Sequence, residues 1–193
     1  MIYENIKRFL EWRDDTDDFG FKRDIWLTSG GFDPLHIGHL RCLQETAYLA
    51  KDKLRYPSKY PGLVTVLVNC DGFLKAKKGY AFMNLKDRME IINSIKGVDA
   101  VIPWHYSNDD FTVVKAIDQL RPNFFTKGGD RTDKTNIPEW EICQQRGCKV
   151  ITGVGGKKVR SSSEMVEKAD RFNLEAAELT GWSDGYTEGR NSR

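Results

Sequence analysis

The sequence lacks the features that mark several large classes of protein. No apolar run approaches the ~20 residues that a membrane-spanning helix needs. Residues 1–8 lack the apolar core of a signal peptide. Charge of one sign does not dominate, because 30 basic and 28 acidic residues leave a formal net charge of +2. We therefore expect a cytoplasmic protein with no membrane partner and no nucleic-acid partner.

Cysteine and histidine are also scarce, with four and three copies in 193 residues. No two cysteines have C-x-x-C spacing, and the histidines complete no zinc pattern, so we predict no metal site built from protein ligands. The P-loop pattern G-x-x-x-x-G-K-[ST] is absent. Reduced, mostly buried side chains are expected for Cys42, Cys70, Cys143 and Cys148.

Short apolar segments alternate with segments of helical periodicity. This alternation predicts an α/β fold, a parallel five-stranded sheet with helices on both faces. In the first long helix, one apolar face would run from Leu40 to Leu54. The expected strands are 25–29, 63–69, 100–103, 123–126 and 149–152, and the expected helices are 37–54, 85–96, 110–120, 137–146 and 162–173.

The chain is long enough for one domain with a sizeable core. Residues 1–24 would form an N-terminal helical extension, with a helix over 2–12 and an acidic loop over 14–18. Residues 25–175 would form the main domain. Residues 176–193 are polar and contain glycine, so we expect a flexible C-terminal tail.

Four segments follow expected strands, and ligands of parallel α/β sheets bind beyond the carboxyl ends of the strands. These segments are 30–39, 69–79, 127–131 and 153–163. Since the carboxyl ends of parallel strands share one edge, the topology predicts that the four segments meet in space.

The first segment reads Gly-Gly-Phe-Asp-Pro-Leu-His-Ile-Gly-His and joins a strand to a helix. His36 and His39 are three residues apart and share one helix face, at a helix start that attracts phosphate. Gly31 would let a phosphate or ribose approach the backbone, and Gly38 would leave room for a base or sugar. The alternative is a surface helix that happens to carry two histidines. We interpret the pair as catalytic groups acting on a nucleoside triphosphate.

Each of the other segments also has a plain structural alternative. Lysines of the second could neutralise phosphates or form an exposed basic loop. The glycines of 127–131 could admit a ligand or make an ordinary turn. The cations and hydroxyls of 153–163 could cradle phosphate or precede a helix capped by its S-x-x-E spacing.

Taken in order, these segments resemble the cytidylyltransferase-like nucleotidyltransferases, the H-x-G-H group, over roughly residues 25–172. Within that group the chain is most similar to the heptose 1-phosphate adenylyltransferases and the glycerol 3-phosphate cytidylyltransferases. The resemblance rests on residues 30–39, Asn69, Asp71, 77–79, Arg88, 98–103, 127–130 and 161–163.

The resemblance implies a Rossmann-like fold and transfer of AMP or CMP from ATP or CTP to a small phosphorylated acceptor, with release of pyrophosphate. The acceptor would be a sugar phosphate or polyol phosphate, and Mg²⁺ would be bound mainly through the triphosphate. The catalytic residues would be His36, His39, Lys77 and Lys78. The nucleotide would be bound by Gly31, Phe32, Asp33, Gly38, Lys127, Gly128, Gly129, Asp130, Arg131, Arg160, Ser161, Ser162 and Ser163. The acceptor would be bound by Asn69, Asp71, Lys75 and Arg88.

Two other functions stay open at this point. One is a nicotinamide mononucleotide or pantetheine-phosphate adenylyltransferase, which residues 127–130 fit less well. The other is a non-catalytic nucleotide-binding module, against which the intact histidine pair argues. The chain departs from the family pattern at residues 1–24, 55–62 and 157–160, which leaves the acceptor open. The base stays open because backbone hydrogen bonds select it, and the oligomeric state stays open with a homodimer among the options.

Overall fold

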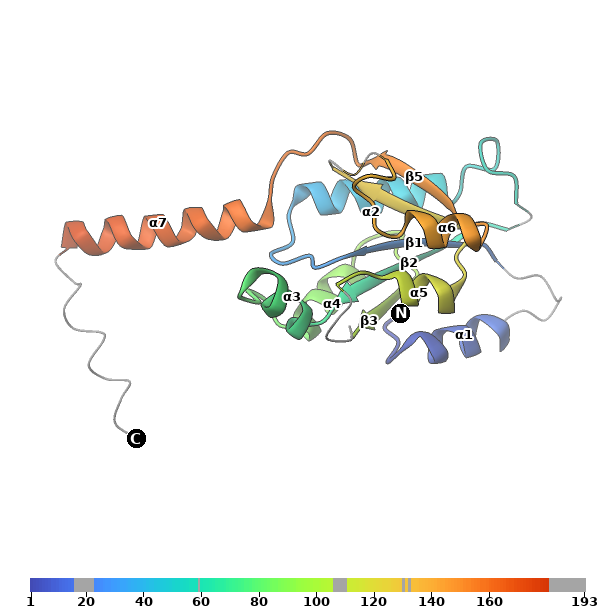
Figure 1. The fold of residues 1–193 in the computed structure, drawn as a ribbon, viewed down its shortest axis with the longest axis horizontal. Helices are drawn as coiled ribbons and strands as arrows, with labels where there is room; N and C mark the ends of the chain where they lie inside the picture. The colour runs from blue at the N-terminus through green and yellow to red at the C-terminus, as the bar shows by residue number, and fades with distance from the viewer. Residues whose placement is uncertain (16–22, 59, 106–110, 130, 132, 181–193) are drawn as a thin grey trace.

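A five-stranded parallel sheet forms the centre of the computed structural model, with strand order β3-β2-β1-β4-β5 (Figure 1). The structure describes residues 1–15, 23–58, 60–105, 111–129, 131 and 133–180. The strands are β1 (Ile25–Gly30), β2 (Leu63–Asn69), β3 (Ala100–Trp104), β4 (Phe124–Gly128) and β5 (Lys149–Val154). All five strands confirm the predicted segments to within two residues at either end, and the α/β fold class is confirmed.

Helices cover both faces of this sheet (Figure 1). They are α1 (Ile6–Asp15), α2 (Ile37–Leu49), α3 (Asp71–Lys78), α4 (Leu85–Asn93), α5 (Val114–Leu120), α6 (Trp140–Gln145) and α7 (Ser162–Thr180). Helices α2 and α4 pack on one face, and α1, α5 and α6 pack on the other. None of the described helices is long and apolar enough to cross a membrane.

Strand side chains alternate between the two layers of the core. Ile25 and Leu27 belong to the cluster beneath α1, α5 and α6, whereas Trp26 packs with α2. Because successive residues of a strand point to opposite faces, a sheet covered on both sides requires unbroken apolar runs. Strand β2 shows this, since all seven of its residues are buried. All four cysteines are free and three are buried, as predicted.

The N-terminal segment is part of the main core. Phe9 of α1 is fully buried, and α1 contacts β3 and α5. Ile2 pairs with Val101 as a short parallel bridge at the edge of the sheet. The predicted acidic loop over 14–18 is partly wrong, because α1 continues through Asp15. Its remaining residues lie outside the described part of the chain.

The first long helix is shorter than predicted and ends at Leu49. The carboxylate of Asp52 accepts hydrogen bonds from the backbone nitrogens of Leu54 and Arg55, at 3.2 and 3.1 Å. Aspartate competes in this way with the backbone bonds of a helix. Leu54, which was expected on the apolar face, is 98% exposed.

The predicted loop around the three lysines is wrong, because residues Asp71–Lys78 form helix α3. Phe73 and Leu74 are buried and anchor this helix. Gly79 ends the helix in a left-handed conformation, with φ of 85°. The signals were present in the sequence, since an acidic first turn, a basic last turn and a following glycine are typical of a helix.

The last helix extends further than expected. Helix α7 continues to Thr180 and extends away from the sheet (Figure 1), so the predicted tail over 176–193 begins as helix. Residues 181–193 lie outside the described part of the chain. The other helices differ from the prediction by a few residues at their ends, where bounds are least certain from sequence.

Candidate active site

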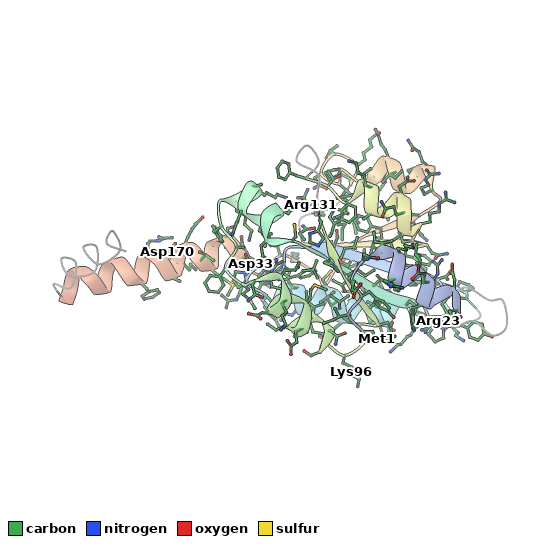
Figure 2. All side chains as sticks on the ribbon, turned by 90° about the horizontal axis from the view of Figure 1, so that it is seen from below. Met1, Arg23, Asp33, Lys96, Arg131 and Asp170 are labelled. Carbon is green, nitrogen blue, oxygen red and sulfur yellow. The ribbon has the colours of Figure 1, made fainter. Side chains whose placement is uncertain are left out.

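A cavity of about 620 Å³ lies at the carboxyl ends of the strands. All four predicted segments contribute to its lining, which includes residues 28–33 of the β1 end, Lys77 and Lys78 of α3, Lys127 of β4 and residues 154–163 after β5. Figure 2 shows Asp33 near the start of α7, whereas Arg23, which precedes β1, lies toward the opposite end of the molecule. The topology therefore brings the four segments together as predicted.

His36 and His39 begin helix α2 as a reciprocal cap. Nδ1 of His36 accepts a hydrogen bond from the Gly38 backbone nitrogen at 3.1 Å, and Nδ1 of His39 accepts one from the His36 backbone nitrogen at 3.3 Å. The two rings stack with centroids 3.8 Å apart. Because each Nδ1 acts as an acceptor, each neutral ring carries its proton on Nε2. Each ring therefore offers one Nε2–H donor, and both residues line the cavity.

Both imidazoles are neutral at pH 7 in the free protein. Burial lowers the pKa of His39 to about 4, and the charges of His36 and Lys78 act in the same direction. Burial and the charge of Arg160 also lower the pKa of His36. A bound anion favours the charged form of histidine. The pair can therefore donate hydrogen bonds to phosphate when free and gain charge when phosphate is bound.

Glycine is needed at positions 31 and 38 for packing reasons that differ from the ligand contacts expected from the sequence. A Cβ at Gly38 would lie 3.0 Å from Cε1 and 3.1 Å from Nδ1 of His36, so the ring of that histidine fills the space expected for a base or sugar. A Cβ at Gly31 would lie 2.7 Å from Leu74, so this glycine admits α3 against the end of β1. Gly38 thus leaves room for the His36 ring, and Gly31 lets α3 pack against the end of β1.

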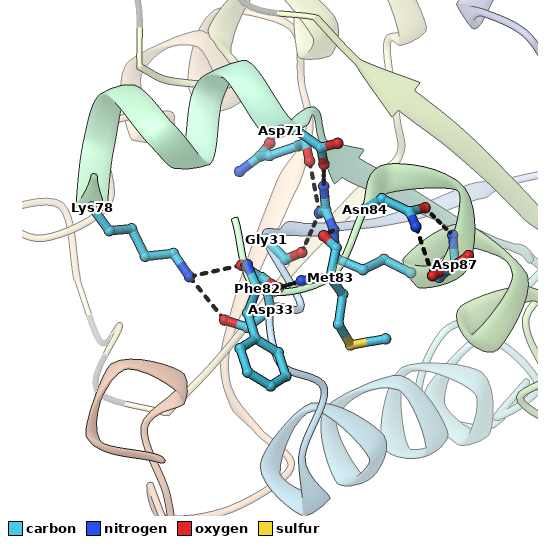
Figure 3. A network of polar contacts seen from close by, with 10 residues as sticks. Gly31, Asp33, Asp71, Lys78, Phe82, Met83, Asn84 and Asp87 are labelled. Atoms are coloured by element: carbon cyan, nitrogen blue, oxygen red, sulfur yellow. Dashed lines mark hydrogen bonds and ion pairs between the residues drawn. The ribbon is translucent and has the colours of Figure 1, made fainter. Parts of the chain in front are cut away.

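Asp33 is buried and holds the segment that follows α3. Its carboxylate accepts hydrogen bonds from the backbone nitrogens of Phe82 and Met83, at 2.8 and 2.6 Å (Figure 3). Nζ of Lys78 donates to the Asp33 carbonyl oxygen at 2.8 Å and lies 3.5 Å from its carboxylate. Asp33 was predicted to bind nucleotide. It lines the cavity, but these contacts occupy both of its carboxylate oxygens.

Arg88 corrects the predicted acceptor site. Its side chain is fully buried and is absent from the cavity lining, so it has no surface with which to touch an acceptor. It donates to the carbonyl oxygens of Gly31 at 2.5 Å, Asn69 at 2.8 Å and Met83 at 3.0 Å, and to the Asp71 carboxylate at 2.6 Å. It therefore joins the ends of β1 and β2 to the start of α4.

Asp71 and Lys75 are likewise absent from the cavity lining, so of the four predicted acceptor residues only Asn69 lines it. Asp71 forms an ion pair with Arg88 at 2.6 Å, and Lys75 is exposed on α3. Asn69 ends β2 and is 8% exposed. Its side-chain oxygen has no hydrogen-bond partner among the described residues.

The basic segment after β5 lies over the start of α2. Gly155 approaches α2 closely, because a Cβ there would lie 2.6 Å from the backbone nitrogen of Cys42, and its own nitrogen donates to Glu45 at 2.6 Å. The hydroxyl of Ser162 donates to the Pro34 carbonyl oxygen at 3.0 Å. The lining here includes Lys157, Lys158, Arg160, Ser161, Ser162 and Ser163. Cations and hydroxyls therefore gather beside the histidine pair.

Lys127 lies buried at the end of β4 with a partner that sequence reasoning missed. Its ammonium is 3.4 Å from Oε2 of Glu139 and 3.4 Å from Oγ of Ser29. Burial lowers the pKa of Lys127, and Glu139 partly opposes that shift. Glu139 is 5% exposed and lines the cavity. The only sequence signal was an acidic residue just before a helix.

The rest of the predicted segment after β4 is partly described. Gly128, Gly129 and Arg131 line the cavity, and Arg131 donates to the Asn136 carbonyl oxygen. Asp130 lies outside the described residues.

Phe32 also lines the cavity, with its ring edge-on to that of His39 at 5.1 Å between centroids. Among the described residues, no group of three or more His, Cys, Asp or Glu side chains is placed to hold a metal ion.

Comparison with known proteins identifies the family. Residues 27–168 match the family model described as cytidylyltransferase-like. The chain belongs to the cytidylyltransferase-like family. This family comprises nucleotidyltransferases, and the match covers every element that builds the cavity, from β1 to the first turns of α7.

Curated relatives support the assignment. The chain is 31% identical over 149 residues to a "Bifunctional protein HldE" of Marinomonas sp., 30% over 146 residues to that of Coxiella burnetii, and 28% over 155 residues to that of Syntrophotalea carbinolica. These alignments cover 76%, 75% and 78% of this chain, but only 28%, 27% and 28% of the relatives. The chain therefore spans less than a third of the length of these relatives.

A solved structure has the same fold. The lipopolysaccharide core biosynthesis protein from Thermoplasma volcanium GSS1 superposes with a TM-score of 0.51 and 21% identity, covering 72% of this chain and 98% of that protein. At this identity the likeness concerns the fold alone.

Proposed function

We propose that this cytidylyltransferase-like protein transfers a nucleotidyl group from ATP or CTP to the phosphate of a small acceptor. The observation that carries the proposal is the stacked pair His36 and His39, whose Nε2–H donors stand beside a basic segment and a helix start. Helix N-termini, hydroxyls and cations together suit a triphosphate.

The chemistry needs no covalent intermediate. An oxygen of the acceptor phosphate attacks the α-phosphorus, and a new P–O bond forms. The bond from the α-phosphorus to the oxygen that bridges it to the β-phosphorus breaks, and its electron pair leaves with pyrophosphate. Catalysis of this kind rests on positioning and on groups that face the developing charge. His36 and His39 would donate to phosphate oxygens, and Lys77 and Lys78 would neutralise charge.

The two lysines of α3 would differ in role. Lys78 is held by Asp33 and is 20% exposed, so its ammonium is fixed beside the histidines. Lys77 is exposed, and its ammonium lies 5.6 Å from the centre of the Phe73 ring. We assign Lys78 to a fixed phosphate oxygen and Lys77 to the arriving acceptor phosphate.

Mg²⁺ would be bound mainly through the triphosphate. The described residues offer no cluster of metal ligands, and both carboxylate oxygens of Asp33 already accept backbone hydrogen bonds. An ion held by phosphate oxygens and water suits such a site, because Mg²⁺ often keeps several waters. When bound, the ion would neutralise charge on the departing pyrophosphate.

The acceptor would be a sugar phosphate or polyol phosphate, as the resemblance to heptose 1-phosphate adenylyltransferases and glycerol 3-phosphate cytidylyltransferases suggests. A thermal-shift screen of ATP, CTP, GTP and UTP with Mg²⁺ tests the nucleotide half of the proposal, because a ligand of the native state raises the melting temperature. We expect ATP or CTP to give a larger shift than GTP and UTP. The absence of a shift with all four nucleotides would contradict the proposal.

A further inference from the structure

The cavity contains a buried carboxylate that the transfer chemistry does not use. Oε1 of Glu139 accepts a hydrogen bond from the backbone nitrogen of Val113 at 3.3 Å. Oε2 has no hydrogen-bond partner among the described residues, although the Lys127 ammonium stands 3.4 Å away as an ion pair. The side chain lines the cavity.

Oε2 of Glu139 is a buried acceptor that lacks a hydrogen bond from the described part of the chain when no ligand is bound. Buried polar atoms almost always have a hydrogen-bond partner, and leaving one without a partner destabilises the folded state. Lys127 balances the charge of Glu139, but a 3.4 Å contact is longer than the usual 2.7–2.9 Å of a charge-assisted hydrogen bond. A hydroxyl from the cavity could donate to Oε2 and satisfy it.

A second buried acceptor without a hydrogen-bond partner among the described residues lines the same cavity. The side-chain oxygen of Asn69 is buried and has no partner among the described residues. Asn69 ends β2 and Lys127 lies on β4, so they flank the central strand β1 on either side. Two separate acceptors that lack hydrogen-bond partners among the described residues fit a ligand with several hydroxyl groups.

This part of the cavity is distinct from the triphosphate side. The histidine pair begins α2, which packs on one face of the sheet. Glu139 precedes α6 and bonds to Val113 at the start of α5, and both of these helices pack on the opposite face. Phe73 and Phe111 line the cavity with ring centroids 5.8 Å apart. The carboxylate therefore lies on the side of the cavity nearest to the starts of α5 and α6.

We propose that Glu139 and Asn69 are specificity-determining residues that bind hydroxyl groups of the acceptor. The inference rests on the proposed nucleotidyl transfer. The Lys127 ammonium lies 3.4 Å from Oε2 of Glu139 and borders this subsite. A site built to bond a hydroxyl discriminates strongly against an analogue that lacks it, because its own polar groups then stay unpaired.

The wild-type protein provides the first test. Pyrophosphate release is measured with ATP or CTP and a panel of glycerol 3-phosphate, mannose 1-phosphate and a heptose 1-phosphate, and then with deoxy analogues of the active acceptor. We expect at least one deoxy analogue to lose about 10-fold or more in kcat/KM. Equal rates for all analogues would overturn the subsite. No pyrophosphate release with any acceptor would instead contradict the proposed function.

Variants assign the effect to the carboxylate. Glu139→Gln keeps the shape and removes the charge, and Glu141→Gln makes the same change at an exposed position two residues later. We expect E139Q to raise the acceptor KM about 10-fold and to leave the nucleotide KM unchanged. E139Q should also discriminate less than the wild type against the deoxy analogue. E141Q should behave as the wild type. A raised nucleotide KM would place the carboxylate at the ribose and overturn the assignment. If E139Q does not fold, Asn69→Ser tests the second acceptor with the same readout.

Discussion

The ammonium of Lys78 lies 2.8 Å from the carbonyl oxygen of Asp33 and 3.5 Å from its carboxylate (Figure 3). This contact joins the last turn of α3 to the segment that leads into α2. The same carboxylate holds the backbone of Phe82 and Met83. One aspartate thus fixes a lysine, a loop and the approach to the histidine pair.

Alanine substitutions of the three lysines of α3 should affect activity and melting temperature differently. Lys78→Ala should lower kcat and the melting temperature together, because Lys78 bonds Asp33 and, in the proposed mechanism, neutralises phosphate charge. Lys77→Ala should lower activity with no change in melting temperature. Lys75→Ala is the matched control and should leave both unchanged, because Lys75 does not line the cavity. Activity loss in K75A equal to that in K77A would show that the whole basic face acts on the substrate.

Replacement of Arg88 should destabilise the fold. Arg88→Lys keeps the charge but cannot make four directed bonds, and a buried acceptor left without its partner costs about 1–3 kcal/mol. Urea denaturation measures the loss. Arg146→Lys is the control, because its pair with Asp118 is exposed and such pairs contribute about 0–1 kcal/mol. Similar stabilities for the two variants would contradict the role given to Arg88.

The stability of the protein should depend on pH through His39. Its pKa is about 4 in the folded state against 6.5 unfolded, so the unfolded chain binds a proton first as the pH falls. The free energy of unfolding should therefore fall between pH 6.5 and about pH 4. His39→Asn keeps a side-chain oxygen to accept from His36 and should remove this part of the dependence. Denaturation curves at several pH values check it, and identical profiles for both proteins would refute it.

The basic segment after β5 should act on nucleotide affinity. Lys157→Glu and Arg160→Glu should raise the nucleotide KM more than they lower kcat, because cations on this segment would bind ground and transition states alike. Added salt should weaken nucleotide binding to the wild type more than to the variants. A raised acceptor KM with an unchanged nucleotide KM would move this segment to the acceptor side.

The sequence predicted a parallel five-stranded sheet and the four segments that meet at its carboxyl edge, because these follow from apolar periodicity and topology. Helix α3 was missed although Gly79 and the charge pattern indicated it. The roles of Asp33 and Arg88 were not readable from sequence, since a motif residue that binds a ligand and one that binds the backbone look the same. Glu139 was missed because its partner Lys127 lies twelve residues away, and only the fold brings them together.

Product analysis tests the central claim most directly. Purified protein is incubated with Mg²⁺, ATP or CTP, and the acceptor panel, and the nucleotidyl product and pyrophosphate are quantified by mass spectrometry and enzymatic assay. We predict equimolar formation of both, dependent on acceptor, and a loss of at least ~100-fold in kcat for His36→Ala and His39→Ala, as for the removal of one preorganised donor. Near-normal kcat in folded histidine variants, or no nucleotidyl product with the wild-type protein, would contradict the account.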